Sequence, residues 1–294
     1  MTMPSKLKDY ASLVAFSHTV FAMPFAATAV VLAHAEPAHV PLSLKRVAAL
    51  IVCMVSARSA AMAFNRYIDR DIDAENPRTA SRDIPAGRVS PGEALALTVG
   101  ASVLFVGAAA TLGALPALLA VPVLGVLLGY SLAKRFTWAA HAWLGVALAL
   151  APGGAWVAMG AAPNAGILSL MLAVVSWLFG FDVLYSLQDE HFDRARGLHS
   201  VPARFGTKGA LWLSGLAHVV TVLAFVSTGF FLHRGALFFV AAFAAALMLA
   251  WEHWIVGAGD LTRINKAFFD INAWIAVGFF ALVLADELVR RASV

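Results

Sequence analysis

The chain has 294 residues, of which 61% are apolar and only 13% are charged, and its mean hydropathy is +0.81. A soluble domain carries about 25% charged residues, so this composition excludes a soluble globular protein, and the many apolar side chains exclude disorder. The single cysteine, Cys53, excludes a disulfide scaffold, and the net charge of +4 indicates basic cytoplasmic loops of a membrane protein rather than a nucleic-acid partner.

Nine apolar segments approach or reach the length of about 20 residues that a helix needs to cross a bilayer. They predict an all-α fold, a polytopic membrane bundle of about nine transmembrane helices capped by polar cytoplasmic loops. In chain order the segments are 13–33, 44–64, 94–112, 115–132, 139–159, 165–186, 209–231, 235–256 and 268–288.

The first segment also has features of a cleavable signal peptide, because Lys6 and Lys8 precede it and Ala33-His34-Ala35 follows. The segment is long for such a signal and contains several polar residues. We therefore expect it to be retained as a span.

The distribution of Lys and Arg predicts the orientation in the membrane. With a cytoplasmic N-terminus, fifteen of the 21 basic residues lie on the cytoplasmic side, five lie on the other side, and Arg58 lies inside a span. This asymmetry agrees with the positive-inside rule. We expect a multi-pass protein of the bacterial plasma membrane, with its N-terminus and its active site facing the cytoplasm.

Two cytoplasmic regions, 65–90 and 182–208, are much more polar than the other loops and hold nine of the 17 carboxylates. The first region ends at Ser90-Pro91-Gly92-Glu93, which is a capping box with proline at the first helical position. We therefore expect the chemistry at the cytoplasmic face.

The spacing of these acids is helical. Asn65, Asp69 and Asp73 recur every four residues, so they form one ridge about 12 Å long if the second span continues as a helix. Like charges spaced in this way repel each other, so a helix that carries them is expected to receive a cation. In the second region, one helical face is predicted to carry Asp182, Tyr185, Asp189 and Asp193.

The two acid pairs are equally separated in the chain. Asp69 to Asp189 and Asp73 to Asp193 both span 120 residues. This spacing predicts a single domain, 1–294, built from two similar halves, 1–135 and 136–294, whose acids face each other.

Oxygen ligands without Cys or His in register favour a hard cation such as Mg²⁺, which usually takes one or two carboxylates together with substrate phosphates. Neighbouring basic side chains suit phosphate oxygens. A ligand with a phosphate head and a hydrocarbon tail, such as an isoprenoid diphosphate, fits this arrangement. The basic residues are Arg70, Arg78, Arg82, Lys134, Arg135 and Arg204.

The motifs Asn65-Arg66-x-x-Asp69-x-x-x-Asp73 and Asp182-x-x-Tyr185-x-x-x-Asp189-x-x-x-Asp193 resemble the two aspartate-rich motifs of the UbiA superfamily of intramembrane prenyltransferases. Segments 58–65 and 197–206 look most like the 4-hydroxybenzoate polyprenyltransferase branch, in a subgroup that includes prenyltransferases of the futalosine route to menaquinone. The resemblance covers nearly the whole chain.

The resemblance implies a helical bundle around a central cavity and a Mg²⁺-dependent enzyme of quinone biosynthesis. The enzyme would transfer a polyprenyl group from polyprenyl diphosphate to the carbon of 4-hydroxybenzoate ortho to the hydroxyl. Arg58 is similar to a family arginine near the aromatic substrate, and Asn65 and Asp182 lie beside the metal ligands. The family's metal ligands match Asp69, Asp73, Asp189 and Asp193, and its diphosphate contacts resemble Arg78, Arg82 and Lys134.

Two further roles follow from the reaction that this resemblance implies. The aromatic face of Tyr185 can stabilise an allylic carbocation, and Asp182 or the released diphosphate can accept the proton that the phenolic ring loses. Arg204 is a further candidate contact of the substrate.

Several alternatives remain open from the sequence. A dihydroxynaphthoic acid offers the same phenol and carboxylate as 4-hydroxybenzoate. A polyprenyl-diphosphate phosphatase or a cation transporter would also use acids at span ends. The length of the prenyl tail and the oligomeric state are not readable. We expect packing or hydrogen bonding, rather than metal binding or catalysis, for His18, His141, His218, Asp270 and Asn272.

Overall fold

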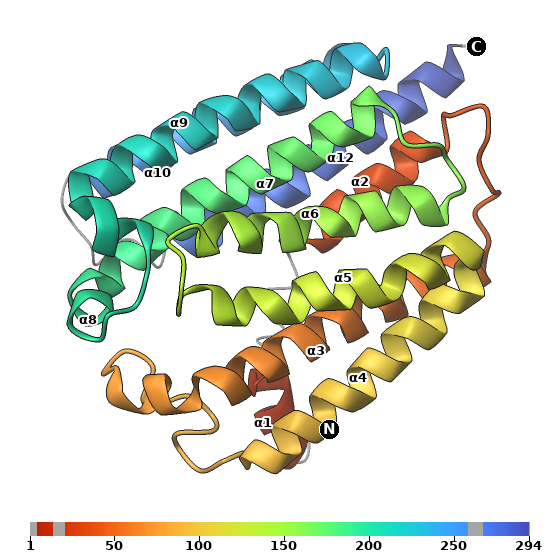
Figure 1. The fold of residues 1–294 in the computed structure, drawn as a ribbon. Coiled ribbons are helices and arrows are strands. Elements are labelled where there is room, and N and C mark those ends of the chain that lie inside the picture. The colour runs from red at the N-terminus through yellow and green to blue at the C-terminus, as the bar shows by residue number, and fades with distance from the viewer. Residues whose placement is uncertain (1–4, 14–20, 258–266, 294) are drawn as a thin grey trace. The chain divides into compact units, whose positions relative to one another are not determined.

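The structure, a computed structural model, describes residues 5–13, 21–257 and 267–293. Eight of its helices are long and apolar enough to cross a membrane. The chain divides into two compact units, one of residues 1–19 and 43–132 and one of residues 20–42 and 133–294 (Figure 1).

The first unit is built around one very long helix. This helix, α3 (Leu44–Glu75), has 32 residues, so it is about 48 Å long and exceeds the roughly 30 Å of a hydrocarbon core. Its last turns, which carry Asn65, Asp69 and Asp73, therefore extend beyond the apolar layer. The other helices of the unit are α1 (Ser5–Leu13), α4 (Pro91–Leu112), which packs along α3, and α5 (Ala114–Ala133).

The predicted capping box at the start of α4 is confirmed. Ser90 Oγ accepts a hydrogen bond from the Glu93 N–H at 3.2 Å, and the Glu93 carboxylate accepts one from the Ser90 N–H at 2.7 Å. The same carboxylate accepts bonds from Lys6 Nζ at 3.0 Å and Tyr10 Oη at 3.1 Å, which raise the pKa of Lys6 and of Tyr10 above their usual values. Glu93 thus ties α1 to the first turn of α4.

In the second unit, α7 (Ala165–Ser186) packs against both α6 (Ala140–Ala158) and α9 (Val201–Phe231), as Figure 1 shows. Its core contains fully buried aromatic rings, among them Phe25, Trp177 and Phe225. The remaining elements are α2 (Met23–Ala33), the 3₁₀ turn η2 (Leu187–Asp189), α8 (Glu190–Ala195), α10 (Ala236–Gly257), the π-helical turn η4 (Ala267–Ile271) and α12 (Asn272–Ala292).

A kink at Gly206 interrupts α9. This glycine has φ 71° and ψ 173°, a left-handed conformation that only a residue without a Cβ adopts at little cost. The kink separates the first turn, which closes the second polar loop, from the apolar part of the helix. The predicted span begins at residue 209, although helical residues begin at Val201, because the charged Arg204 and Lys208 precede it.

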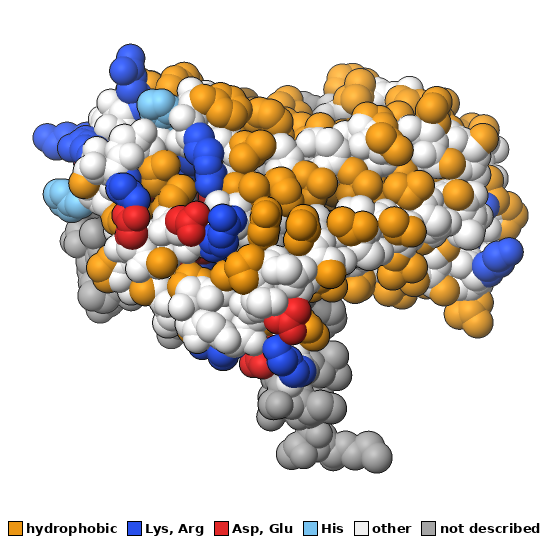
Figure 2. All heavy atoms as spheres, turned by 60° about the horizontal axis from the view of Figure 1, so that its bottom comes forward, with side chains coloured by type: hydrophobic (Ala, Val, Ile, Leu, Met, Phe, Trp, Pro, Cys, Tyr) orange, Lys and Arg blue, Asp and Glu red, His pale blue; other side chains and the backbone are white. Residues whose placement is uncertain are grey.

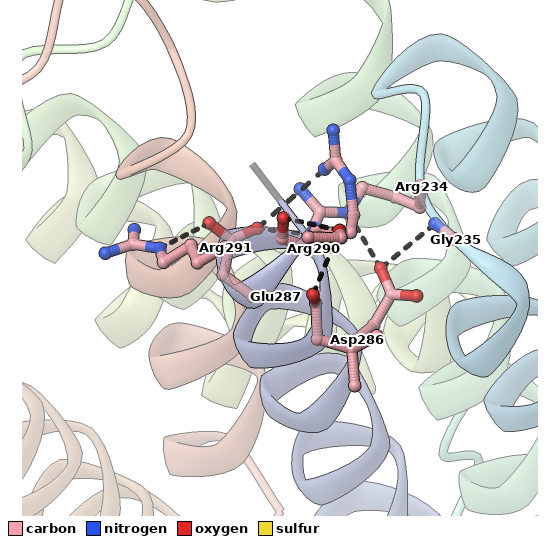
Figure 3. Close-up of polar contacts among 8 residues, drawn as sticks. Arg234, Gly235, Asp286, Glu287, Arg290 and Arg291 are labelled. Carbon is pink, nitrogen blue, oxygen red and sulfur yellow. Dashed lines mark hydrogen bonds and ion pairs between the residues drawn. The ribbon is translucent and has the colours of Figure 1, made fainter.

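A charged cluster at the α9–α10 turn was not predicted (Figure 3). The side chain of Arg234, only 1% exposed, forms ion pairs with Asp286 and Glu287 of α12. The Gly235 N–H also donates to Asp286 at 3.1 Å, and Arg291 Nε donates to Glu287 at 2.8 Å. Arg234 thus joins the α9–α10 turn to α12, whereas Arg291 pairs with Glu287 within α12.

Eight of the nine predicted spans coincide with a long apolar helix. The remaining segment, 13–33, contains only the 11-residue α2 within the described part of the chain, and its residues 14–20, His18 included, lie outside that part. Figure 2 shows hydrophobic side chains spread over much of the visible surface, with charged ones gathered in a few places. The similarity of the two predicted halves stays a prediction.

We expect Gly145→Ala to destabilise the second unit. A Cβ at Gly145 on α6 would lie 2.6 Å from the backbone carbonyl oxygen of Val175 on α7. A backbone atom cannot move aside as the end of a flexible side chain can, so the two helices would have to separate. Overpacking of this kind costs about 1–3 kcal/mol, which corresponds to a Tm roughly 3–10 °C lower in detergent. Gly154→Ala on the same helix is the control, because a Cβ there meets nothing within 4 Å. Equal melting temperatures for the two variants would contradict the prediction.

Candidate functional site

The first motif lies on the last turns of α3. Asn65 Nδ2 donates a hydrogen bond to Asp69 Oδ2 at 2.8 Å, which is the contact expected between helical residues four apart. Because α3 continues to Glu75, the predicted ridge of Asn65, Asp69 and Asp73 is confirmed. Arg70 turns back onto its own helix, where its guanidinium lies 4.9 Å from the ring centroid of Tyr67.

Asp73 is the most buried acid of this motif. Its side chain is 6% exposed, and Oδ1 lies 2.6 Å from Arg82 Nη1 of the following loop. Its other oxygen, Oδ2, is buried and accepts no hydrogen bond from the part of the chain that the structure describes. Asp73 and the predicted diphosphate contact Arg82 are thus brought together, with one carboxylate oxygen still available.

The loop after α3 is held by a different acid. Asp83 is buried, and its carboxylate accepts hydrogen bonds from Arg88 Nε at 2.9 Å and Ser12 Oγ at 3.0 Å. The Thr79 hydroxyl donates to the Asp73 carbonyl, and the exposed Arg78 donates its N–H to the amide oxygen of Asn76. Asp83 therefore shapes the loop that presents Arg78 and Arg82.

The second motif does not lie on one regular helix. Asp182 and Tyr185 are on α7, Asp189 ends the 3₁₀ turn η2, and Asp193 is on α8. A 3₁₀ turn advances with 3.0 residues per turn instead of 3.6, so the acids beyond Ser186 rotate away from the face predicted by α-helical spacing. The prediction of one continuous α-helix from Asp182 to Asp193 is therefore wrong, because the 3₁₀ turn separates α7 from α8.

Lys134, in the segment between α5 and α6, lies at this motif. Its Nζ is 3.6 Å from Asp193 Oδ2, and its carbonyl accepts the His199 N–H at 2.7 Å. Asp193 Oδ2 is buried and, like Asp73 Oδ2, accepts no hydrogen bond within the described residues. The last acid of each motif therefore keeps one oxygen for a further partner.

Asp182 pairs with a residue that sequence reasoning assigned to packing or hydrogen bonding. His141 Nδ1 lies 2.6 Å from Asp182 Oδ2, and the imidazole is 1% exposed whereas the Asp182 side chain is 22% exposed. Nothing in the sequence links two residues 41 positions apart. Tyr185 packs partly against a buried cluster around Leu184 and Val201.

The predicted substrate contacts Arg58 and Arg204 lie on two different helices. Arg58 is half-buried on α3, two turns before Asn65, and Arg204 is exposed near the start of α9. Tyr130 of α5 lies against α3, with its hydroxyl 3.9 Å from the Met62 sulfur.

The hydrogen bonding that was expected for Asn272 and His218 is confirmed. Asn272 accepts a hydrogen bond from Trp177 Nε1 at 2.8 Å and donates one to Glu252 at 2.8 Å. His218 lies 2.9 Å from His253, nitrogen to nitrogen. Both residues stabilise packing inside the second unit.

The acids fit a metal that takes few protein ligands. Within the described residues of either unit, no three Cys, His, Asp or Glu side chains are close enough to hold a metal ion among themselves. Mg²⁺ usually takes only one or two carboxylates and completes its shell with water and substrate phosphates. The available oxygens of Asp73 and Asp193 suit that chemistry. Convergence of the two motifs on one diphosphate stays a prediction, since each belongs to its own unit.

The eight long apolar helices, with acids and bases at their ends, define a multi-pass integral membrane protein. The model of the UbiA prenyltransferase family matches residues 22–282. The chain belongs to this family and is a transferase of prenyl groups. The alternative hypothesis of a cation transporter is therefore wrong.

Similar proteins agree in fold and length. The 4-hydroxybenzoate octaprenyltransferase of Pseudomonas syringae pv. syringae (strain B728a) is 32% identical over 258 residues, which cover 84% of this chain and 83% of that protein. The apo structure of a UbiA homolog from Aeropyrum pernix K1 is 31% identical, with a TM-score of 0.82 and coverage of 94% and 98%. A UbiA homolog from Archaeoglobus fulgidus bound to GPP and Mg²⁺ is 18% identical, covers 94% and 99%, and has a TM-score of 0.69.

We expect Asp83→Asn to loosen the loop after α3 without removing a reacting group. A buried carboxylate that loses its charge weakens its bonds to Arg88 and Ser12, at a cost of about 1–3 kcal/mol. The measurement is limited trypsin cleavage after the loop arginines in detergent, which should be several-fold faster. Asp71→Asn is the matched control, because the Asp71 side chain is 79% exposed. Equal cleavage rates of the two variants would contradict the structural role of Asp83.

Proposed function

We propose that this enzyme is a 4-hydroxybenzoate polyprenyltransferase of quinone biosynthesis. It joins the prenyl chain of a polyprenyl diphosphate to the ring carbon ortho to the phenol and releases diphosphate. The proposal includes a Mg²⁺ cofactor and a cytoplasmic active site in the bacterial plasma membrane. Relatives about 30% identical that bear the name 4-hydroxybenzoate octaprenyltransferase support this substrate class.

One observation carries the proposal. Asp73 and Asp193 close the two motifs, and each has a buried carboxylate oxygen that accepts no hydrogen bond within the described residues. A buried anionic oxygen that accepts no hydrogen bond is costly, so its retention supports a ligand at each acid. Each acid also lies beside a cation, Arg82 or Lys134, that suits a phosphate.

The diphosphate end of the reaction follows from these groups. Asp69, Asp73, Asp189 and Asp193 would hold Mg²⁺, which when bound supplies positive charge to the leaving diphosphate. Arg78, Arg82 and Lys134 would bind the remaining phosphate oxygens, and Asn65 and Arg204 are further candidate contacts. As the allylic carbon–oxygen bond breaks, its electron pair passes to the diphosphate and the prenyl carbon becomes a cation.

The acceptor end needs an anchor, an aromatic face and a base. Arg58 would bind the carboxylate of the phenolic acid, and Tyr185 would stabilise the allylic cation through its ring face. The ortho carbon of the ring then forms the new carbon–carbon bond. Asp182 would accept the proton that this carbon loses when aromaticity returns. The bilayer keeps water away from the cation, which would otherwise be hydrolysed.

The test is the product formed by purified protein in detergent from labelled prenyl diphosphate, Mg²⁺ and either 4-hydroxybenzoate or a dihydroxynaphthoic acid. The proposal requires prenylated 4-hydroxybenzoate, identified by mass, and its loss with EDTA. Prenylation of the naphthoic acid alone would assign the enzyme to menaquinone synthesis. Release of free prenyl alcohol as the main product would indicate a phosphatase.

We expect Asp73→Asn and Asp193→Asn each to lower prenyl transfer by about 100-fold or more, because each removes an anionic oxygen from the proposed metal site. Expression and membrane insertion should stay close to wild type. Asp71→Asn is the control, since Asp71 neighbours the motif but points to solvent. Full activity in either motif variant would refute the metal role.

We expect Arg58→Ala to raise the KM for the phenolic acid about 10-fold or more, with binding of prenyl diphosphate changed by less than about three-fold. The reason is that Arg58 would pair with the acceptor carboxylate and not with the diphosphate. Arg58→Lys retains the charge, so its KM for the phenolic acid should lie between those of the wild type and of Arg58→Ala. The measurement is steady-state kinetics with each substrate varied. An equal loss for both substrates would rule against an acceptor-specific role.

A further inference from the structure

The hydrogen bonds of His141 determine which of its nitrogens carries the proton. The Val201 N–H donates to His141 Nε2 at 3.3 Å. A backbone N–H can only donate, so Nε2 must present its lone pair. The proton of the neutral ring then lies on Nδ1, which donates to Asp182 Oδ2 at 2.6 Å.

The surroundings of the imidazole allow it little freedom. It is 1% exposed, and the Phe179 ring, on the same helix as Asp182, meets it edge-on with centroids 6.4 Å apart. Rotation of the ring would break both hydrogen bonds at once. Asp182 therefore has one oxygen held by a fixed donor, while its carboxylate is still 22% exposed and open to a small molecule.

The stretch 134–141, which leads from the end of α5 into the first turn of α6, contacts the second motif at two points. Lys134 at its start faces Asp193, and His141 in the first turn of α6 faces Asp182. His141 also holds Val201 in the first turn of α9, directly after the second polar loop. One short stretch of chain thus orients both ends of the motif.

We propose that His141 is a positioning residue for the transfer step. It holds the Asp182 carboxylate in the orientation in which its other oxygen can receive the proton of the ring carbon as the new carbon–carbon bond forms. In the same step the electrons of the broken carbon–hydrogen bond return to the ring, and the proton moves to Asp182. This inference rests on the proposed function, because it requires a phenolic acceptor.

The test compares three variants of the purified full-length enzyme with labelled prenyl diphosphate, Mg²⁺ and 4-hydroxybenzoate. His141→Leu removes both hydrogen bonds, and we expect kcat to fall about 10-fold or more while the KM for prenyl diphosphate changes less than about three-fold. His141→Gln restores a donor and an acceptor on a side chain of similar length and should recover most of kcat. His218→Leu is the matched control, because His218 is equally buried but bonds to His253 and not to a carboxylate.

A double-mutant cycle separates positioning from general packing. In an Asp182→Asn background, His141→Leu should change kcat by less than about three-fold, because the group through which it acts is already altered. Equal losses from His141→Leu in both backgrounds would overturn the positioning role, as would an unchanged His141→Leu enzyme. A wild-type enzyme that forms no prenylated phenolic acid would overturn the proposed function and this inference together, whereas the other outcomes leave that function intact.

Discussion

Carboxylates at the ends of apolar helices impose the main constraint on this molecule, because a charge removed from water must find a partner. The structure meets this requirement locally, with a basic or imidazole group beside each of several buried or half-buried acids. The pairs are Asp73 with Arg82, Asp83 with Arg88, Asp182 with His141, Asp193 with Lys134, and Asp286 and Glu287 with Arg234. Charges at the helix ends are therefore ordered before any substrate binds.

The completeness of this pairing distinguishes structural acids from candidate reactive ones. Both oxygens of Asp83 accept hydrogen bonds, from Arg88 and Ser12, and the acid shapes a loop. Asp73 and Asp193 each have a buried oxygen that accepts none within the described chain. In the sequence these acids have the same chemistry and similar surroundings. Their difference arises from donors that the fold places beside them, and it agrees with a family whose members transfer prenyl groups.

Much of the fold could be predicted because a membrane helix requires a long apolar segment, which is visible in the sequence. Eight predicted spans match helices, and the capping box at Ser90 has the hydrogen bonds that its pattern indicates. The deviations have local causes. The 3₁₀ turn at Leu187–Asp189 leaves no periodic signature, so the second motif was assigned to one face. The kink of α9 depends on a left-handed Gly206, which composition does not reveal.

The sequence by itself determined the membrane class, the approximate spans, the two acidic motifs and the contact between Asn65 and Asp69, because these depend on neighbours within a few residues. Only the tertiary structure decided which distant group partners each acid. His141 meets Asp182 across 41 positions, and Arg234 meets Asp286 across 52. Hydrogen bonds act over about 3 Å, and such distances between helices are set by packing that no local pattern records. The partners of the acids, including the histidine that holds Asp182, are consequences of the fold.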